Sequence, residues 1–144
     1  MTEQLDLTGA RNVTWAPTIE YIYRGGPLPL TGATIRLQVR LYPGAPGDPL
    51  INVVSPAGGL TFTDLPATDA EIASGDLSAG DRVLRIFPIV ARATLQAMPT
   101  GLNKPEAGQA DAYDWDFVIT YADAAQDRPA AGEFFLEPGV TLNA

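Results

Sequence analysis

Aspartates close together in the last third of the chain are the residues whose spacing best fits a metal site. Asp111, Asp114 and Asp116 lie near one another, with Asp123 a short way beyond. Ca²⁺ prefers several carboxylate oxygens as ligands, which makes the first three the candidate metal ligands. The segment lacks the glycine and the closing glutamate of a calcium-binding loop, however, and alternate aspartates also line the solvated face of a strand. We favour the strand, and the sequence predicts neither a metal nor a cofactor.

Residues for acid–base or nucleophilic catalysis are scarce. The chain has no histidine and no cysteine, so it lacks the usual general base, the thiol nucleophile and the commonest metal ligands. Its serines and its single lysine form no evident pair of nucleophile and base. The glycine pairs at 25–26 and 58–59 are not followed by the lysine and helix start of a phosphate-binding loop, so we predict turns there. The sequence therefore favours a protein that is not an enzyme.

Aromatic residues offer a second chemistry, because exposed rings on a β-sandwich can stack against sugars. Most of them alternate with polar residues along expected strands, which places them on the inward face. Core packing is therefore favoured for Trp15, Tyr21, Tyr23, Tyr113, Trp115 and Tyr121. Tyr42 differs, because it is expected on the outward face of its strand beside a Pro/Gly turn. It is the better candidate for an exposed contact.

The elements that would position these residues are short strands. The clearest lies within 30–50, where apolar and polar residues alternate as they do in a strand with one face in a core. A Pro/Gly turn at 43–49 ends it. The same alternation predicts strands at 13–24, 50–54, 60–63, 82–90, 113–121 and 133–137, with short helical turns at 67–72 and 91–98.

Three details of this pattern carry further expectations. Pro17 should bend the strand over 13–24, since proline cannot donate to a ladder. Apolar residues on both faces of 82–90 predict a central position in a sheet. Residues 1–12 fit either a short edge strand or an arm that lies on a neighbour. Together these features predict one all-β sandwich domain over 1–144, with about seven to nine short antiparallel strands and one or two short helical turns.

Composition limits the partners. The formal net charge is −8 at pH 7, and the positive residues are spread singly, so no basic patch for nucleic acid is expected. No apolar run approaches the roughly 20 residues of a membrane span. The first residues have neither the basic region nor the apolar stretch of a signal peptide, so we expect synthesis in the cytoplasm.

Three segments carry a resemblance to a known family. The stretch 18–40, which reads TIEYIYRGGPLPLTGATIRLQVR, resembles the opening of small tail and baseplate modules of tailed bacteriophages, whose N-terminal domain is that of the baseplate upper protein. The stretch 112–120 resembles that family's Tyr-X-Tyr-Asp-Leu-X-Leu strand, and 134–141 resembles its closing strand. The similarity covers roughly 13–141. The chain departs from the pattern at 64–80 and 103–110, where it is longer.

The resemblance implies an immunoglobulin-like sandwich that acts as a structural adaptor, without catalysis or cofactor. The implied partners are other virion proteins and copies of the chain itself, with no nucleic acid, membrane or small-molecule substrate. The implied location is the virion, after synthesis in the bacterial host cytoplasm. Two alternatives remain open: a capsid decoration or head-fibre anchor protein, and a carbohydrate-binding module for host recognition. The last predicts an exposed pair of aromatic residues on one sheet face.

Candidate interface residues follow from these hypotheses. Leu5 and Leu7, at alternate positions ahead of the Gly9 turn, would attach an N-terminal arm to a neighbour. Deletion of residues 1–12 is then expected to leave the domain folded but to abolish assembly. Tyr42 and Leu142 are the other two candidates.

Overall fold

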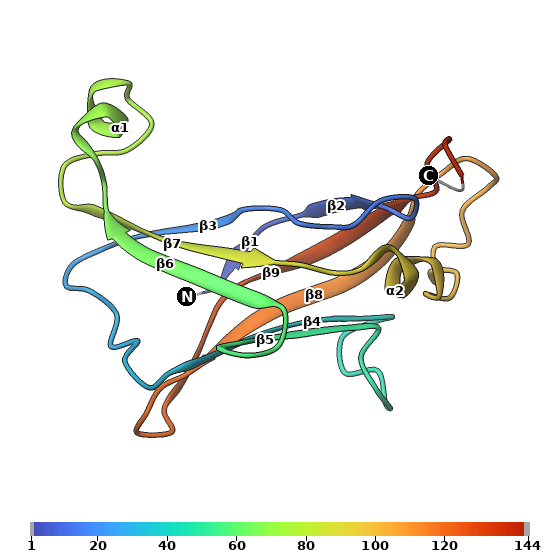
Figure 1. The fold of residues 1–144 in the computed structure, drawn as a ribbon, viewed down its shortest axis with the longest axis horizontal. Helices are drawn as coiled ribbons and strands as arrows, with labels where there is room; N and C mark the ends of the chain where they lie inside the picture. Colours follow the sequence, from blue (N-terminus) through green and yellow to red (C-terminus); the bar gives the residue numbers. More distant parts are fainter. Residues whose placement is uncertain (1, 143–144) are drawn as a thin grey trace.

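Nine strands and two short helices make up the computed structural model, which describes residues 2–142 (Figure 1). The strands form two sheets. The larger has the order β1-β9-β8-β4-β5, with β2 also pairing with β9, and the smaller has the order β3-β7-β6. The elements are β1 Glu3–Gln4, β2 Leu7–Ala10, β3 Ile19–Arg24, β4 Thr34–Arg40, β5 Ile51–Ser55, β6 Leu60–Pro66, α1 Asp69–Ala73, β7 Asp81–Pro88, α2 Arg92–Gln96, β8 Asp111–Thr120 and β9 Gln126–Glu137.

The strand order is that of an immunoglobulin-like sandwich. Strands β3, β7 and β6 correspond to one sheet of that fold, and β9, β8, β4 and β5 correspond to the other. The predicted all-β sandwich is therefore confirmed. One detail of the prediction is wrong: β1 and β2 run parallel to β9, whereas the other strand pairs are antiparallel.

The N-terminal segment is an edge strand of the chain's own sheet. Leu5 N donates to Ala131 O at 2.8 Å, and the indole N–H of Trp115 donates to Leu5 O at 2.8 Å. Gly132 allows this approach, because a Cβ on that residue would lie only 2.0 Å from Leu5 O. Of the two interpretations of residues 1–12, the described part of the segment matches the edge strand.

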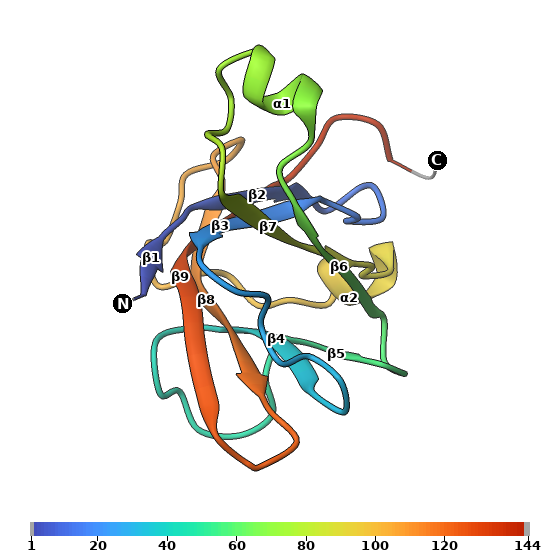
Figure 2. The same cartoon turned by 90° about the vertical axis from the view of Figure 1, so that its left-hand side faces the viewer.

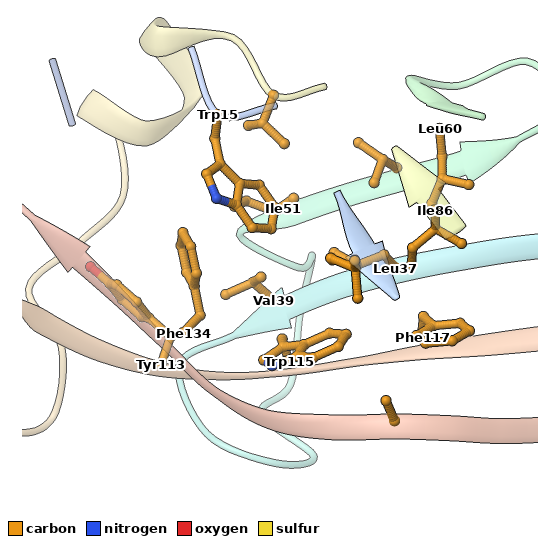
Figure 3. Packing of buried hydrophobic residues seen from close by; sticks show 14 of the residues in the cluster. Trp15, Leu37, Val39, Ile51, Leu60, Ile86, Tyr113, Trp115, Phe117 and Phe134 are labelled. Atoms are coloured by element: carbon orange, nitrogen blue, oxygen red, sulfur yellow. The ribbon is translucent and has the colours of Figure 1, made fainter. Parts of the chain in front are cut away.

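The core lies between the sheets and follows the predicted alternation. Ile35, Leu37 and Val39 of β4 are fully buried, and their polar neighbours face outward. Alternate residues of β8 face the same space, and Figure 3 shows Trp15, Tyr113 and Phe134 facing one another there. The buried hydrophobic residues of β8 are Tyr113, Trp115, Phe117 and Ile119.

The predicted strand over 13–24 is interrupted for a simple reason. Trp15 pairs with Val90, and β3 resumes the same register with β7 at Ile19. Between them this register sets Pro17 opposite Pro88, and neither proline has an N–H to donate. The pairing therefore breaks at the expected residue. Val13, at the start of the predicted strand 13–24, lies outside any strand of the structure, and its side chain is exposed.

Other boundaries shift without changing the architecture. β7 lies in the middle of the smaller sheet, as its two apolar faces predicted. β9 begins at Gln126, so most of the segment expected as a loop before 133 is strand. α1 begins with a capping box formed by Thr68 and Glu71. Within residues 2–142, neither helix is long and apolar enough to cross a membrane.

Candidate interaction surface

The three candidate metal ligands lie on opposite faces of β8. Asp111 faces inward, where it accepts from the guanidinium of Arg11 at 2.9 Å and from Gly101 N at 2.7 Å. Asp114 and Asp116 face outward, because side chains alternate along a strand. Among residues 2–142, no three or more acidic side chains lie close enough to hold a metal ion. The structure thus separates the candidate calcium ligands instead of bringing them together.

A shallow groove of about 690 Å³, lined by both charged and apolar residues, lies on the outward face of β4, β8 and β9. Asp116 accepts from Arg128 at 2.9 Å across it. Asp114 stands between Arg40 and Glu133 in the strand register, and burial raises the pKa of its carboxyl. The residues that line this groove offer both donors and acceptors of hydrogen bonds, and none of them is a serine, threonine, cysteine or lysine.

Arg11 forms a dense network at one end of the sandwich. Its guanidinium donates to the carbonyls of Leu95 and Met98, to Asp111 and to the hydroxyl of Tyr113, at 2.7 to 2.9 Å. Leu95 lies in the last turn of α2 and Met98 lies two residues past its end, so Arg11 caps this helix. We call these residues the Arg11 network.

Tyr113 completes the network by a second bond. Its hydroxyl donates to Pro99 O, upstream in the chain, while it accepts from Arg11. A tyrosine near the start of this strand with such a bond is a feature of immunoglobulin-like sandwiches. Burial raises the pKa of the phenol, so it keeps its proton at neutral pH. The path from α2 to β8 is therefore fixed by buried side chains.

An exposed, mainly apolar surface adjoins α2. Figure 1 shows α2 and the loop between β4 and β5 at the same end of the sandwich. Two adjoining hollows of about 280 and 570 Å³ lie there and share Asp48 and Leu50. Tyr42, which is 41% exposed, lies at the first hollow. We define the Tyr42 surface by Tyr42, Pro46, Pro49, Leu50, Ala93, Ala97 and Pro99, and the buried Met98 also lines the second hollow.

The β4–β5 loop has a fixed shape. Arg40 donates to Ala45 O and Gly47 O, each at 2.8 Å, and Ala45 N donates to Tyr42 O at 3.0 Å. Gly44 and Gly47 have φ values of 76° and 85°, which suit glycine and turn the chain sharply. The Tyr42 surface is thus held by Arg40 on one side and by the Arg11 network on the other.

The predicted interface residues divide into two groups. Leu5 and Leu7 are half-buried and pack against the core, so in this chain they are not free to hold a neighbour. Tyr42 and Leu142 are exposed, the latter at 68%. The amide of Asn12 donates to Thr141 O at 2.9 Å and holds the C-terminal segment beside the first turn.

The aromatic residues considered for sugar stacking are mostly internal. Trp15, Tyr113 and Trp115 are buried, which agrees with core packing. The other three are half-buried at the opposite end of the sandwich. Tyr23 donates to Asp64, and Tyr121 donates to Asp127 at 2.7 Å. Among the described residues, Tyr42 is the one aromatic side chain that counts as exposed.

Sequence reasoning did not predict that α2 contributes to the Tyr42 surface or that Arg11 holds α2 in place. Arg11 lies in an expected turn, and nothing near it in the sequence marks its partners.

No protein-family model matches the chain, and a comparison with curated proteins finds no match.

Proposed function

We propose that this protein is a non-catalytic structural adaptor of a tailed bacteriophage particle, in the tail, baseplate or neck. It acts through contacts with other virion proteins and with copies of itself. The observation that carries the adaptor role is the Tyr42 surface, an exposed aromatic and proline surface. Hydrogen bonds from the partly buried Arg11 and Arg40 hold its two parts in place.

The chemistry of the Tyr42 surface suits a protein partner. Tyrosine is enriched at the centres of protein interfaces, because its large ring loses little conformational entropy on binding. Proline and the small residues Ala93 and Ala97 present a surface that needs little reordering. Asp48 supplies charge between the two hollows. Such a surface binds by burial of area and needs no deep pocket.

The place in a phage particle rests on the sequence resemblance of 18–40, 112–120 and 134–141. The immunoglobulin-like sandwich is the fold which that resemblance implies. The two segments that are longer in this chain than in the family pattern have different structures. Residues 64–80 contain the helix α1. Residues 103–110 connect Gly101 to Asp111, whose side chain accepts from Gly101 N and belongs to the Arg11 network.

The two alternatives differ in what they require. A capsid decoration protein has the same kind of surface but occupies many equivalent positions on a shell. A carbohydrate-binding module requires an exposed pair of aromatic residues, and the described residues offer Tyr42 without an exposed aromatic neighbour. We therefore rank glycan binding below both structural roles.

A count of copies per particle tests the proposal. Particles from the lysate of the encoding strain are purified on a density gradient, and peptides of this chain are quantified by mass spectrometry against the major capsid protein. A copy number in small multiples of three or six supports the tail or neck. A number close to that of the capsid protein supports decoration, and absence from particles overturns both structural roles.

A substitution then tests the surface. Tyr42→Arg should leave the thermal unfolding midpoint within about 2 °C, because the side chain is exposed, and should abolish incorporation into particles. Thr61→Arg, on the outward face of β6, is the matched control and should be incorporated normally. Normal incorporation of the Tyr42 variant would exclude this surface as the site of attachment.

A further inference from the structure

Strand β3 forms an open edge of the smaller sheet. Figure 2 shows β3 and β6 on either side of β7, and no described strand pairs with the other side of β3. A hollow of about 290 Å³ lies between Tyr21 of β3 and Asp127 and Pro129 of β9, and Thr2 of the N-terminal segment also lines it. An open edge presents unpaired backbone groups that can bind another strand.

The strand register shows which backbone groups are available. Trp15 and Val90 exchange both backbone hydrogen bonds, at 3.0 and 2.9 Å, and the same register continues along β3 and β7. Hydrogen-bonded pairs recur at every second residue of an antiparallel ladder. The odd-numbered residues of β3 therefore bond to β7. The N–H and C=O groups of Glu20, Ile22 and Arg24 point to the open edge.

The side chains of these three residues are self-complementary. If two β3 strands pair antiparallel about Ile22, Glu20 of each copy lies opposite Arg24 of the other. Each already has a partner in its own chain, Arg85 or Asp81, yet their side chains remain 49% and 59% exposed. Opposite charges across an antiparallel pair stabilise it. The spacing of charge along β3 thus fits a second copy of the same strand.

An apolar row crosses the smaller sheet at the same level. Ile22 pairs with Val83, and Val83 pairs with Leu65, so the three side chains stand side by side on the outward face. Val83 is buried, whereas Ile22 and Leu65 are 48% and 52% exposed. Pairing about Ile22 would join two such rows into one. It would cover Ile22, which is otherwise half exposed.

The opposite edge of this sheet lacks such a pattern. The outward side chains of β6 are Thr61, Thr63 and Leu65, which carry no charge. They would allow pairing in several registers, because nothing opposes a slip. β3 is therefore the edge whose sequence specifies both the partner strand and its register.

We propose that two copies of this chain form a two-fold symmetric dimer through antiparallel pairing of their β3 strands, with Ile22 opposite Ile22. The two three-stranded sheets become one continuous sheet. A self-complementary patch of this kind is what a two-fold interface requires. The dimer specifies one self-contact of the adaptor proposed above, and it rests on that proposal only for its place in a particle.

Disulfide trapping tests the register, because the natural chain has no cysteine. In the variant Ile22→Cys, the two Cα atoms should lie about 5.5 Å apart, within the range that a disulfide spans. Mild oxidation of the full chain should then link most of the protein as dimers. Leu65→Cys is the control, since it is equally exposed on the same face but lies on β6. It should link at least about tenfold more slowly. Equal rates, or faster linkage through residue 65, would overturn the proposal.

Charge reversal gives an independent test by sedimentation equilibrium on chains without cysteine. Glu20→Arg and Arg24→Glu each place like charges opposite one another twice, so each should raise the dimer dissociation constant about tenfold or more. The double variant E20R/R24E restores both pairs and should dimerise like the natural chain. Thermal unfolding shows whether each variant is folded. A natural chain that stays monomeric up to about 1 mM, or a double variant as weak as the single ones, would contradict the dimer.

The outcomes separate this inference from the proposed function. A dimer in solution whose chain is absent from particles would support the β3 pairing and overturn the phage role. A chain that is a monomer in solution but is counted in particles would support the phage role and overturn the β3 pairing.

Discussion

The guanidinium of Arg11 lies 2.9 Å from the carboxylate of Asp111, and this contact joins the end of β2 to the start of β8. The same guanidinium holds the carbonyls of Leu95 and Met98 at the end of α2. Because α2 and the residues after it contribute Ala93, Ala97 and Pro99 to the Tyr42 surface, a residue of the N-terminal segment supports the surface on which the proposed adaptor role rests.

Replacement of Arg11 should destabilise the protein strongly. Arg11→Ala leaves the buried carboxylate of Asp111 without its cation and removes the guanidinium donor to the carbonyls of Leu95 and Met98. We therefore expect a loss of about 3 kcal/mol in the free energy of unfolding. Urea unfolding followed by tryptophan fluorescence measures it. The control is Arg128→Ala, which breaks the exposed ion pair with Asp116 and should cost less than about 1 kcal/mol. Equal losses would show that the Arg11 network contributes no more than a surface pair.

Deletion of residues 1–12 should now prevent folding, contrary to the expectation from the sequence. The deletion removes β1 and β2 from the edge of β9 and also removes Arg11. Circular dichroism should show loss of the cooperative thermal transition. A deletion of residues 1–2 alone leaves both strands and should keep that transition. A folded chain that lacks 1–12 would revive the interpretation of this segment as an external arm.

Gly132→Ala should weaken the attachment of the N-terminal segment. The added Cβ would meet Leu5 O at 2.0 Å, so the backbone at Leu5, between β1 and β2, or that of β9 must move, at a cost of about 2 kcal/mol. Hydrogen exchange should then show faster exchange at the Leu5 amide. Gly26→Ala is the matched control, because a Cβ there meets nothing within 4 Å. Unchanged protection of Leu5 in the Gly132 variant would argue against the close contact.

Asp114→Asn should stabilise the protein in a way that depends on pH. Burial raises the pKa of Asp114 in the folded protein above its ordinary value of 3.8. The folded state therefore binds this proton more tightly than the unfolded state, and the charged carboxylate opposes folding once the pH exceeds the folded pKa. The variant should have the higher thermal midpoint at pH 7, and the difference should vanish below about pH 3. A constant difference at both pH values would assign the effect to something other than ionisation.

Much of the fold could be predicted from local patterns. The alternation of apolar and polar residues over 34–42 and 113–121 identified β4 and β8 and their buried faces, because side chains of a strand point alternately to its two sides. The helical turn predicted at 67–72 corresponds to α1, whose capping box joins Thr68 and Glu71, three residues apart. Tyr42 was found because it lies outward beside a turn.

The candidate site was harder to predict. Alternation placed Asp114 and Asp116 correctly on the outward face, but grouping them with Asp111 was wrong. Asp111 is held on the inner side of β8, where Arg11 neutralises it. Leu5 and Leu7 have the pattern of a strand whether the partner strand belongs to the same chain or to another, so their sequence could not decide between edge strand and arm.

By itself, the sequence determined the strands, their inward and outward faces and the absence of histidine and cysteine chemistry. These depend on composition and on residues a few positions apart. Only the tertiary structure decided that β2 pairs in parallel with β9, that Arg11 meets Asp111, and that α2 stands beside the β4–β5 loop. These contacts join residues far apart in the chain. They form because the two sheets must close around one core, which brings together segments that carry no common local signal.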